Sequence, residues 1–143
     1  MDHIDYEYTV GMDDAEVAER LDSHHVGVLS LAKGDDAYAV PVDYRYEDGR
    51  LLLRLTDDGD SKKVAYADAT DEACFLVYGP DEAWSIVALG RLDRLGDTAG
   101  DDFADRTLNE WFGTLRVFDE DVADLDVVVY ELHVESLTGR TAA

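Results

Sequence analysis

The sequence contains one cysteine, Cys74, so no disulfide can form within the chain. Cys74 stands in the apolar run 73–77 without a cationic neighbour in sequence, and we expect a small buried hydrophobic residue rather than a reactive thiol. The chain also lacks an apolar run long enough to span a membrane. Residues 1–5 have neither the basic nor the apolar segment of a signal peptide. These absences predict a soluble, cytoplasmic protein.

Basic residues are scarce as well. Lysine and arginine number 12 against 34 aspartate and glutamate residues, which gives a formal charge of −22. Such a surface repels nucleic acid and anionic membranes, and neither is expected as a partner. The acids are spread along the chain, as in proteins of salt-rich cells, where screening shortens the repulsion. The three lysines are Lys33, Lys62 and Lys63, and the adjacent pair calls for a local reason.

Recognisable catalytic and metal motifs are also missing. The four histidines, at positions 3, 24, 25 and 133, lack metal-ligand spacing. Neither a nucleophile elbow nor a Walker loop is present. The acidic runs at 35–36, 57–58 and 119–121 are typical of a solvated surface. The sequence therefore predicts no metal site and leaves the catalytic residues unknown.

The length and composition suit one globular domain. The chain has 143 residues, of which 46% are apolar, and this content excludes a disordered acidic chain. A chain of this length buries roughly 70% of its unfolded surface. No repeat or linker divides it, so residues 1–143 are predicted to form a single domain.

Hydrophobic periodicity predicts mainly β structure. Asp13 and Glu16 resemble a capping box before a short helix at 14–23. Six strands are predicted, at Val26–Ala32, Tyr38–Tyr46, Arg50–Leu55, Glu72–Tyr78, Trp84–Leu95 and Val127–Leu137. Further helices are predicted at 62–69 and 101–113, and residues 114–126 are left unassigned. The helices are too few for a doubly wound parallel sheet, which leaves a six-stranded antiparallel split barrel of the mainly β (α+β) class.

Three details of the strands carry further predictions. Pro41 removes a ladder donor, so its backbone lies at an edge, a bulge or a ligand site. Gly90 marks a kink or a close approach of two backbones. In the last strand, alternation predicts four inward side chains, at Val128, Tyr130, Leu132 and Val134.

The polar loop at 56–63 is the most informative segment for function. It combines two hydroxyls (Thr56, Ser61), a flexible glycine (Gly59) and two ammonium groups (Lys62, Lys63) directly before a helix. A helix start offers unpaired N–H groups and a partial positive charge, so this arrangement suits a phosphate dianion. The alternative is a surface helix capped by Ser61, with two solvated lysines. On sequence alone both interpretations stay open.

At this point the sequence resembles a family. The segments that carry the resemblance are Ala39–Val42, the Asp48–Gly49 hairpin, Leu51–Thr56, Gly59–Lys63, Ala73–Tyr78 and Trp84–Leu92. In their order and spacing they are similar to the FMN-binding split barrels related to pyridoxamine 5′-phosphate oxidase, including the nitroimidazole-resistance branch. The similarity extends over residues 12–140.

The resemblance implies an FMN at a homodimer interface. Val40, Pro41 and Val42 would run past the edge of the isoalloxazine ring. Thr56, Ser61, Lys62 and Lys63 would hold the phosphate, and Leu55 would also belong to the cofactor site. Trp84 and Ser85 would approach the flavin bound by the other subunit, and the alternative for Trp84 is a packing residue at the end of the barrel.

The same resemblance limits the expected activity. The chain ends at residues 137–143 without the segment bearing Arg and Trp that true pyridoxamine phosphate oxidases use, so vitamin B6 oxidation is not expected. Leu55 stands where the nitroimidazole-resistance branch often has a histidine. We expect an FMN-binding oxidoreductase that transfers a hydride through flavin N5 to or from an unidentified small molecule. The alternatives are the deazaflavin F420 in place of FMN, a non-catalytic protein that stores or senses flavin, F420 or haem, and a structural protein.

Overall fold

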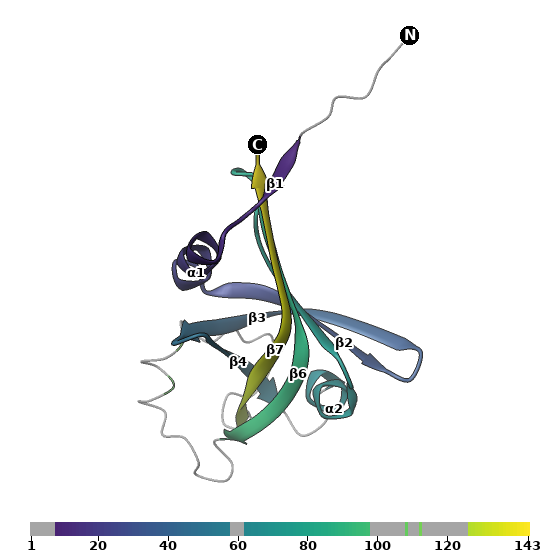
Figure 1. Ribbon diagram of the computed structural model, residues 1–143. Coiled ribbons are helices and arrows are strands. Elements are labelled where there is room, and N and C mark those ends of the chain that lie inside the picture. The colour runs from purple at the N-terminus through teal and green to yellow at the C-terminus, as the bar shows by residue number, and fades with distance from the viewer. Residues whose placement is uncertain (1–7, 58–61, 98–107, 109–111, 113–125) are drawn as a thin grey trace.

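One antiparallel sheet forms the framework of the protein. In the computed structural model, described for residues 8–57, 62–97, 108, 112 and 126–143, the sheet has the strand order β1-β7-β4-β3-β2-β5-β6. An additional pairing of β6 with β7 closes β2 to β7 into a six-stranded barrel, and β1 adds a further strand beside β7 (Figure 1). The elements are β1 (Thr9–Gly11), α1 (Asp14–Asp22), β2 (Val26–Lys33), β3 (Asp36–Glu47), β4 (Arg50–Asp57), α2 (Lys62–Ala69), β5 (Ala73–Gly79), β6 (Trp84–Asp97) and β7 (Asp126–Ala142). The predicted split barrel is confirmed, and β1 was not predicted.

Helix α1 begins where the sequence predicts. The side chain of Asp13 accepts a hydrogen bond from the backbone N–H of Glu16 at 2.8 Å, which satisfies one unpaired donor of the first turn. Val17 and Leu21 are buried beneath the helix. The hydroxyl of Tyr44, on β3, donates to the carbonyl of Leu21 at 2.7 Å and so joins the helix to the barrel.

The barrel interior is filled by the alternate side chains of its strands. Tyr44, Leu53, Phe75 and Ile86 are each no more than 1% exposed. Tyr44 and Phe75 meet edge to face with their ring centroids 5.3 Å apart. Burial of each such side chain contributes about 1.5–3 kcal/mol before the cost of ordering. The same core cluster includes Val17 of α1 and Leu132 of β7, so it draws on elements from both ends of the sequence.

The backbone at Pro41 is hydrogen-bonded on one side only. Residues 36–43 of β3 pair with β2, whereas the pairing with β4 begins at Asp43. The missing N–H of Pro41 therefore faces a gap in the ladder, which confirms the predicted edge position. Among the β3 residues, those at 36–42 are therefore paired with β2 alone.

Gly90 marks a close approach, as predicted. A Cβ at Gly90 would lie 2.0 Å from the carbonyl oxygen of His133, and the β6–β7 register shifts between Leu89 and Gly90. The irregularity bends the strand. Val134, which pairs with Gly90, is 36% exposed, so the prediction that it faces inward is wrong. Beyond it, β7 continues five residues past the predicted end at Leu137.

Between β6 and β7 the structure describes two positions, 108 and 112. The predicted helix at 101–113 and the unassigned stretch 114–126 lie outside the described residues, apart from 108, 112 and 126. The backbone N–H of Phe112 donates to the carbonyl of Leu108 at 2.9 Å, the spacing of one helical turn. Both side chains pack with Leu52 and Val129 in a second apolar cluster. Among the described residues, no helix is long and apolar enough to cross a membrane.

Candidate functional site

The end of β4 and the start of α2 meet at a polar contact. The ammonium group of Lys63 donates a hydrogen bond to the hydroxyl oxygen of Thr56 at 2.6 Å. Lys63 lies in the first turn of α2, where backbone N–H groups lack partners within the helix and carry a partial positive charge. We call Thr56, Lys63 and this helix start the cradle. Ser61, the predicted second hydroxyl, lies outside the described residues.

Lys62 points to a different place from Lys63. Its Nζ atom lies 5.4 Å from the centroid of the Tyr38 ring and 5.5 Å from that of Tyr66. The two rings are themselves 5.5 Å apart, with 49° between their planes. We call Lys62, Tyr38 and Tyr66 the tyrosine cluster. The adjacent lysines, which the sequence treats as equivalent, thus have separate partners.

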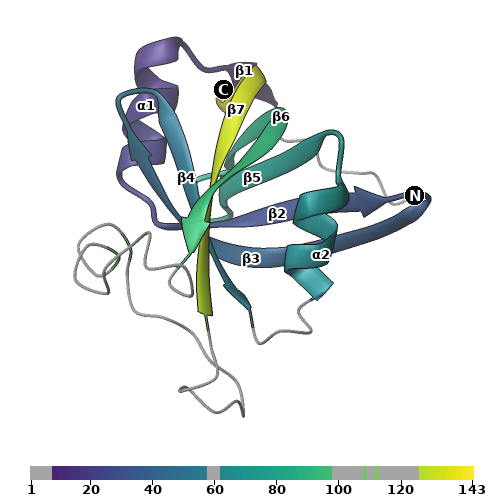
Figure 2. The same cartoon turned by 90° about the horizontal axis from the view of Figure 1, so that it is seen from below.

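The one-sided stretch of β3 lies near α2, which packs across β2 and β3 (Figure 2). Pro41 is exposed there, whereas Val42 is 4% exposed and belongs to the barrel core. Val40 is partly buried against the same core. Leu55 is 1% exposed and also lies in the core. A ligand beside these residues would therefore meet Pro41 and the β3 backbone rather than the side chains of Val42 and Leu55.

The two residues predicted to act across a subunit interface lie away from the cradle. Ser85 pairs with Arg140 near the end of β7, at the top of Figure 1, whereas α2 lies at the lower end of the barrel. Ser85 lines an open groove of about 450 Å³ together with Tyr78, Pro80 and Arg140. Within one chain, the cradle and this groove are therefore separate.

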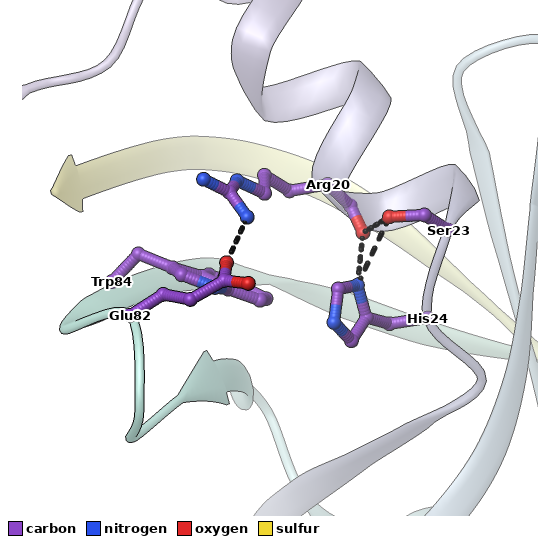
Figure 3. A network of polar contacts seen from close by, with 5 residues as sticks. All are labelled: Arg20, Ser23, His24, Glu82 and Trp84. Atoms are coloured by element: carbon purple, nitrogen blue, oxygen red, sulfur yellow. Dashed lines mark hydrogen bonds and ion pairs between the residues drawn. The ribbon is translucent and has the colours of Figure 1, made fainter.

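Trp84 is enclosed by its own chain. Its side chain is 3% exposed, and its Nε1 donates to Glu82 at 3.1 Å. The Arg20 guanidinium, ion-paired with Glu82, lies 5.2 Å from the ring centroid, and the His24 ring meets the indole edge to face at 4.8 Å (Figure 3). His24 is held in turn by its Nδ1 contact with the Arg20 carbonyl at 2.8 Å. These contacts fit the packing alternative, but Trp84 also lines the groove beside Ser85, so its approach to a partner's flavin stays a prediction.

Sequence reasoning missed a buried ion pair beside the site. Arg54 on β4 forms an ion pair with Asp43, directly opposite on β3, and the two residues are 5% and 9% exposed. The Arg54 guanidinium also lies 5.3 Å from the Phe112 ring centroid. The sequence contains a sign of this ion pair, because the hairpin turn at 48–49 sets a strand register that places Asp43 and Arg54 opposite each other.

A second polar link joins α2 to the barrel. The Tyr130 hydroxyl donates to Asp68 of α2 at 2.7 Å, and Asp68 also pairs with Arg94 at 3.2 Å. Burial, followed by the bond to Asp68, raises the pKa of Tyr130 above its usual range. The phenol is therefore held neutral as a donor that fixes the helix position.

The remaining titratable candidates give no catalytic group. Cys74 is partly buried, and burial, followed by the nearby Glu72 carboxylate, raises the pKa of its thiol. A raised pKa disfavours the reactive thiolate and supports the expectation of an unreactive residue. Within the described part of the chain, no group of three or more His, Cys, Asp or Glu side chains could hold a metal ion.

Several solved structures share this fold. An FAD-binding protein of Mesorhizobium loti superposes with a TM-score of 0.68 at 23% identity, covering 94% of this chain and 99% of the other. The FAD-binding protein of Mycobacterium smegmatis gives 0.63 at 16% identity, with coverages of 93% and 98%. A candidate 5-nitroimidazole antibiotic resistance protein of Bacteroides thetaiotaomicron gives 0.65 at 16% identity, with coverages of 99% and 95%.

Sequence comparison gives a more specific result. No curated protein matches the chain significantly. The family profile described as pyridoxamine 5′-phosphate oxidase, in contrast, matches residues 13–141. That match covers nearly the whole chain, including both strands and the helix that build the site. The chain therefore belongs to the pyridoxamine 5′-phosphate oxidase family.

Proposed function

We propose that the protein binds FMN and that the cradle holds its phosphate. The observation that carries this proposal is the 2.6 Å contact between Lys63 and Thr56, which brings the end of a strand and the start of a helix together. An ammonium group, a hydroxyl and unpaired helix N–H groups are the donors that a phosphate dianion requires. Family membership and the FAD-binding proteins of the same fold support a flavin as the ligand.

The ring of the flavin would lie along residues 39–42 of β3. Backbone groups in this stretch face a gap in the ladder and can bond the polar edge of a planar ring. Bound FMN would supply hydride transfer at its N5 atom, so we propose an oxidoreductase acting on a small molecule. The protein's part is to hold the phosphate, orient the ring and shield one face of it.

We further propose a homodimer in which the groove near Ser85 of the partner subunit completes the flavin site. Tyr78, Val10 and Leu137 are 53%, 48% and 42% exposed, and they belong to β5, β1 and β7 at the groove end of the barrel. Exposed apolar side chains gathered near one groove favour coverage by another protein surface. A stable dimer would bury more than roughly 1,000 Å² in total.

Binding tests of two ligands examine the phosphate assignment. Lys63→Gln removes the ammonium charge and Thr56→Val removes the hydroxyl. Each loses about 1.5–3 kcal/mol of FMN binding, roughly a ten- to more than a hundredfold fall in affinity, because a hydrogen bond to a charged group is lost. Riboflavin, which has no phosphate, keeps its affinity. Flavin fluorescence quenching in high salt gives both constants.

Matched controls make this test decisive. Lys33→Gln removes a lysine charge from the end of β2 and leaves FMN affinity unchanged. Equal FMN binding by wild type and Lys63→Gln would contradict the cradle.

The visible spectrum of the purified protein separates FMN from F420, haem or no cofactor. A flavoprotein that neither accepts electrons from any donor nor passes them to any acceptor in stopped-flow mixing would contradict the oxidoreductase assignment.

A further inference from the structure

The tyrosine cluster joins the two elements, α2 and β3, that carry the two halves of the proposed FMN site. Lys62 directly precedes Lys63, so its Cα is about 3.8 Å from that of a cradle residue. Tyr38 lies two residues before Val40 on the same face of β3, roughly 7 Å along the strand from the ring position. The cluster therefore contacts both the helix that carries the phosphate ligand and the strand that would carry the ring.

The side chains of the tyrosine cluster link helix α2 to strand β3. The Lys62 ammonium group is about equally distant from the two rings, at 5.4 and 5.5 Å. Tyr66 follows Lys62 by four residues on α2, so the two side chains share a helix face. Tyr66 is 9% exposed, and Tyr38 packs against the barrel core, so neither ring is a loose surface group. Cation–π attraction between Lys62 and Tyr38 ties the first turn of α2 to β3.

We propose that Lys62 is a positioning residue, which sets the distance between the cradle and the β3 edge and does not itself bind the phosphate. This inference rests on the proposed function, because it assumes a ligand that reaches both places. The affinity of a ligand that spans the two halves depends on the distance between them. The affinity of a ligand that occupies only one half does not.

Three probes separate these roles: FMN, which spans both halves; riboflavin, which uses the β3 edge; and inorganic phosphate, which uses the cradle. With Lys62→Gln, and equally with Tyr38→Leu, FMN affinity falls by about three- to tenfold, the scale of one or two exposed cation–π contacts. Riboflavin affinity from fluorescence, and phosphate affinity from phosphorus NMR titration, stay at the wild-type values. Lys62→Arg and Tyr38→Phe keep the cation and the ring face, and both restore FMN affinity.

A double variant tests whether the two side chains act as one unit. Lys62→Gln combined with Tyr38→Leu weakens FMN no more than either change alone, because each already breaks the same contact. Proton NMR provides a readout without flavin. The ring currents of the two tyrosines shift the ε-methylene protons of Lys62 upfield, and Tyr38→Leu reduces the shift.

The opposing outcomes are distinct. If Lys62→Gln weakens inorganic phosphate as well as FMN while Tyr38→Leu weakens neither, Lys62 is a phosphate ligand and the inference is wrong. A fall in the affinity of all three ligands, with a lower unfolding midpoint, would show a general structural role and would also overturn it. If Lys63→Gln leaves FMN binding intact, the proposed function itself fails. If Lys63→Gln behaves as expected and the cluster variants have no effect, only the present inference fails.

Discussion

Breaking the ion pair between Arg54 and Asp43 is expected to destabilise the protein strongly. The side chains are 3% and 11% exposed, so both charges have given up most of their contact with water. Arg54→Met retains the apolar stem but leaves the buried Asp43 carboxylate without its guanidinium. Removal of one partner of a buried pair costs about 3–5 kcal/mol, because a charge then remains in a poorly solvated site.

The assay is equilibrium unfolding by urea in high salt, supported by the thermal midpoint. For a chain of this size, the expected loss lowers the midpoint by roughly 9–15 °C. Arg91→Met is the matched control, since Arg91 pairs with Glu135 at 3.2 Å but its side chain is 70% exposed. An exposed pair contributes about 0–1 kcal/mol, so this control changes the midpoint little. The cost of Arg54→Met also persists as salt is raised, because a buried pair is weakly screened.

Two results would refute this reasoning. A loss of stability in Arg54→Met no greater than in Arg91→Met would show that solvent reaches the pair and that burial does not set its energy. Alternatively, the double variant Asp43→Leu and Arg54→Met could cost the sum of the two single changes. Replacing both charges by apolar side chains also removes the buried Asp43 carboxylate, so the double variant should be more stable than Arg54→Met alone.

Three further predictions follow from charge, packing and titration. On dialysis to low salt, the formal charge of −22 is no longer screened, so we expect loss of the helix and strand signals in circular dichroism or of the dimer mass in light scattering. Unchanged values in dilute buffer would contradict the salt-adapted surface, and a monomer in high salt would contradict the shared flavin site. Gly90→Ala lowers the free energy of unfolding by about 1–3 kcal/mol, because the new Cβ would lie 2.0 Å from a backbone oxygen. The control Gly11→Ala is nearly neutral, because no atom lies within 4 Å of its Cβ. Equal urea midpoints for the two variants would refute the close-approach argument. Because the pKa of Tyr130 is raised in the folded state, its contribution to stability is full below the unfolded-state pKa of 10.0 and is lost as the pH rises through the folded-state pKa. Tyr130→Phe removes this loss of stability at alkaline pH. An unchanged pH dependence of the urea midpoint in the variant would show that Tyr130 is not its source.

Local patterns in the sequence were enough to predict most elements. Asp13 caps α1 in the predicted way, and Lys62–Ala69 is the predicted second helix. The apolar periodicity predicted a strand at Tyr38–Tyr46, and the turn at 48–49 sets its register with β4. These features depend on residues close together in the chain, so short-range periodicity and turn chemistry specify them.

The candidate site could be predicted only in part. The loop composition indicated Thr56 and Lys63 as neighbours of a helix start, and the structure brings the two together. The loop composition did not indicate that Lys62 turns toward Tyr38, because that contact joins residues 24 positions apart in the chain. The residues predicted from the resemblance to act from a second subunit stay a prediction.

The sequence by itself determined the mainly β fold, the helix starts and the polar composition of the loop at 56–63, because caps, turns and two-residue periodicity are local signals. Only the tertiary structure decided the pairing of β1 with the end of β7, the exposure of Val134 and the separate partners of the two lysines. The separate partners of the lysines depend on how α2 packs against β3 and β4. The other two features depend on which distant segments become neighbours when β6 pairs with β7 and closes the barrel. A local pattern cannot specify that closure, since it reports which face of a strand is apolar and not what will cover it.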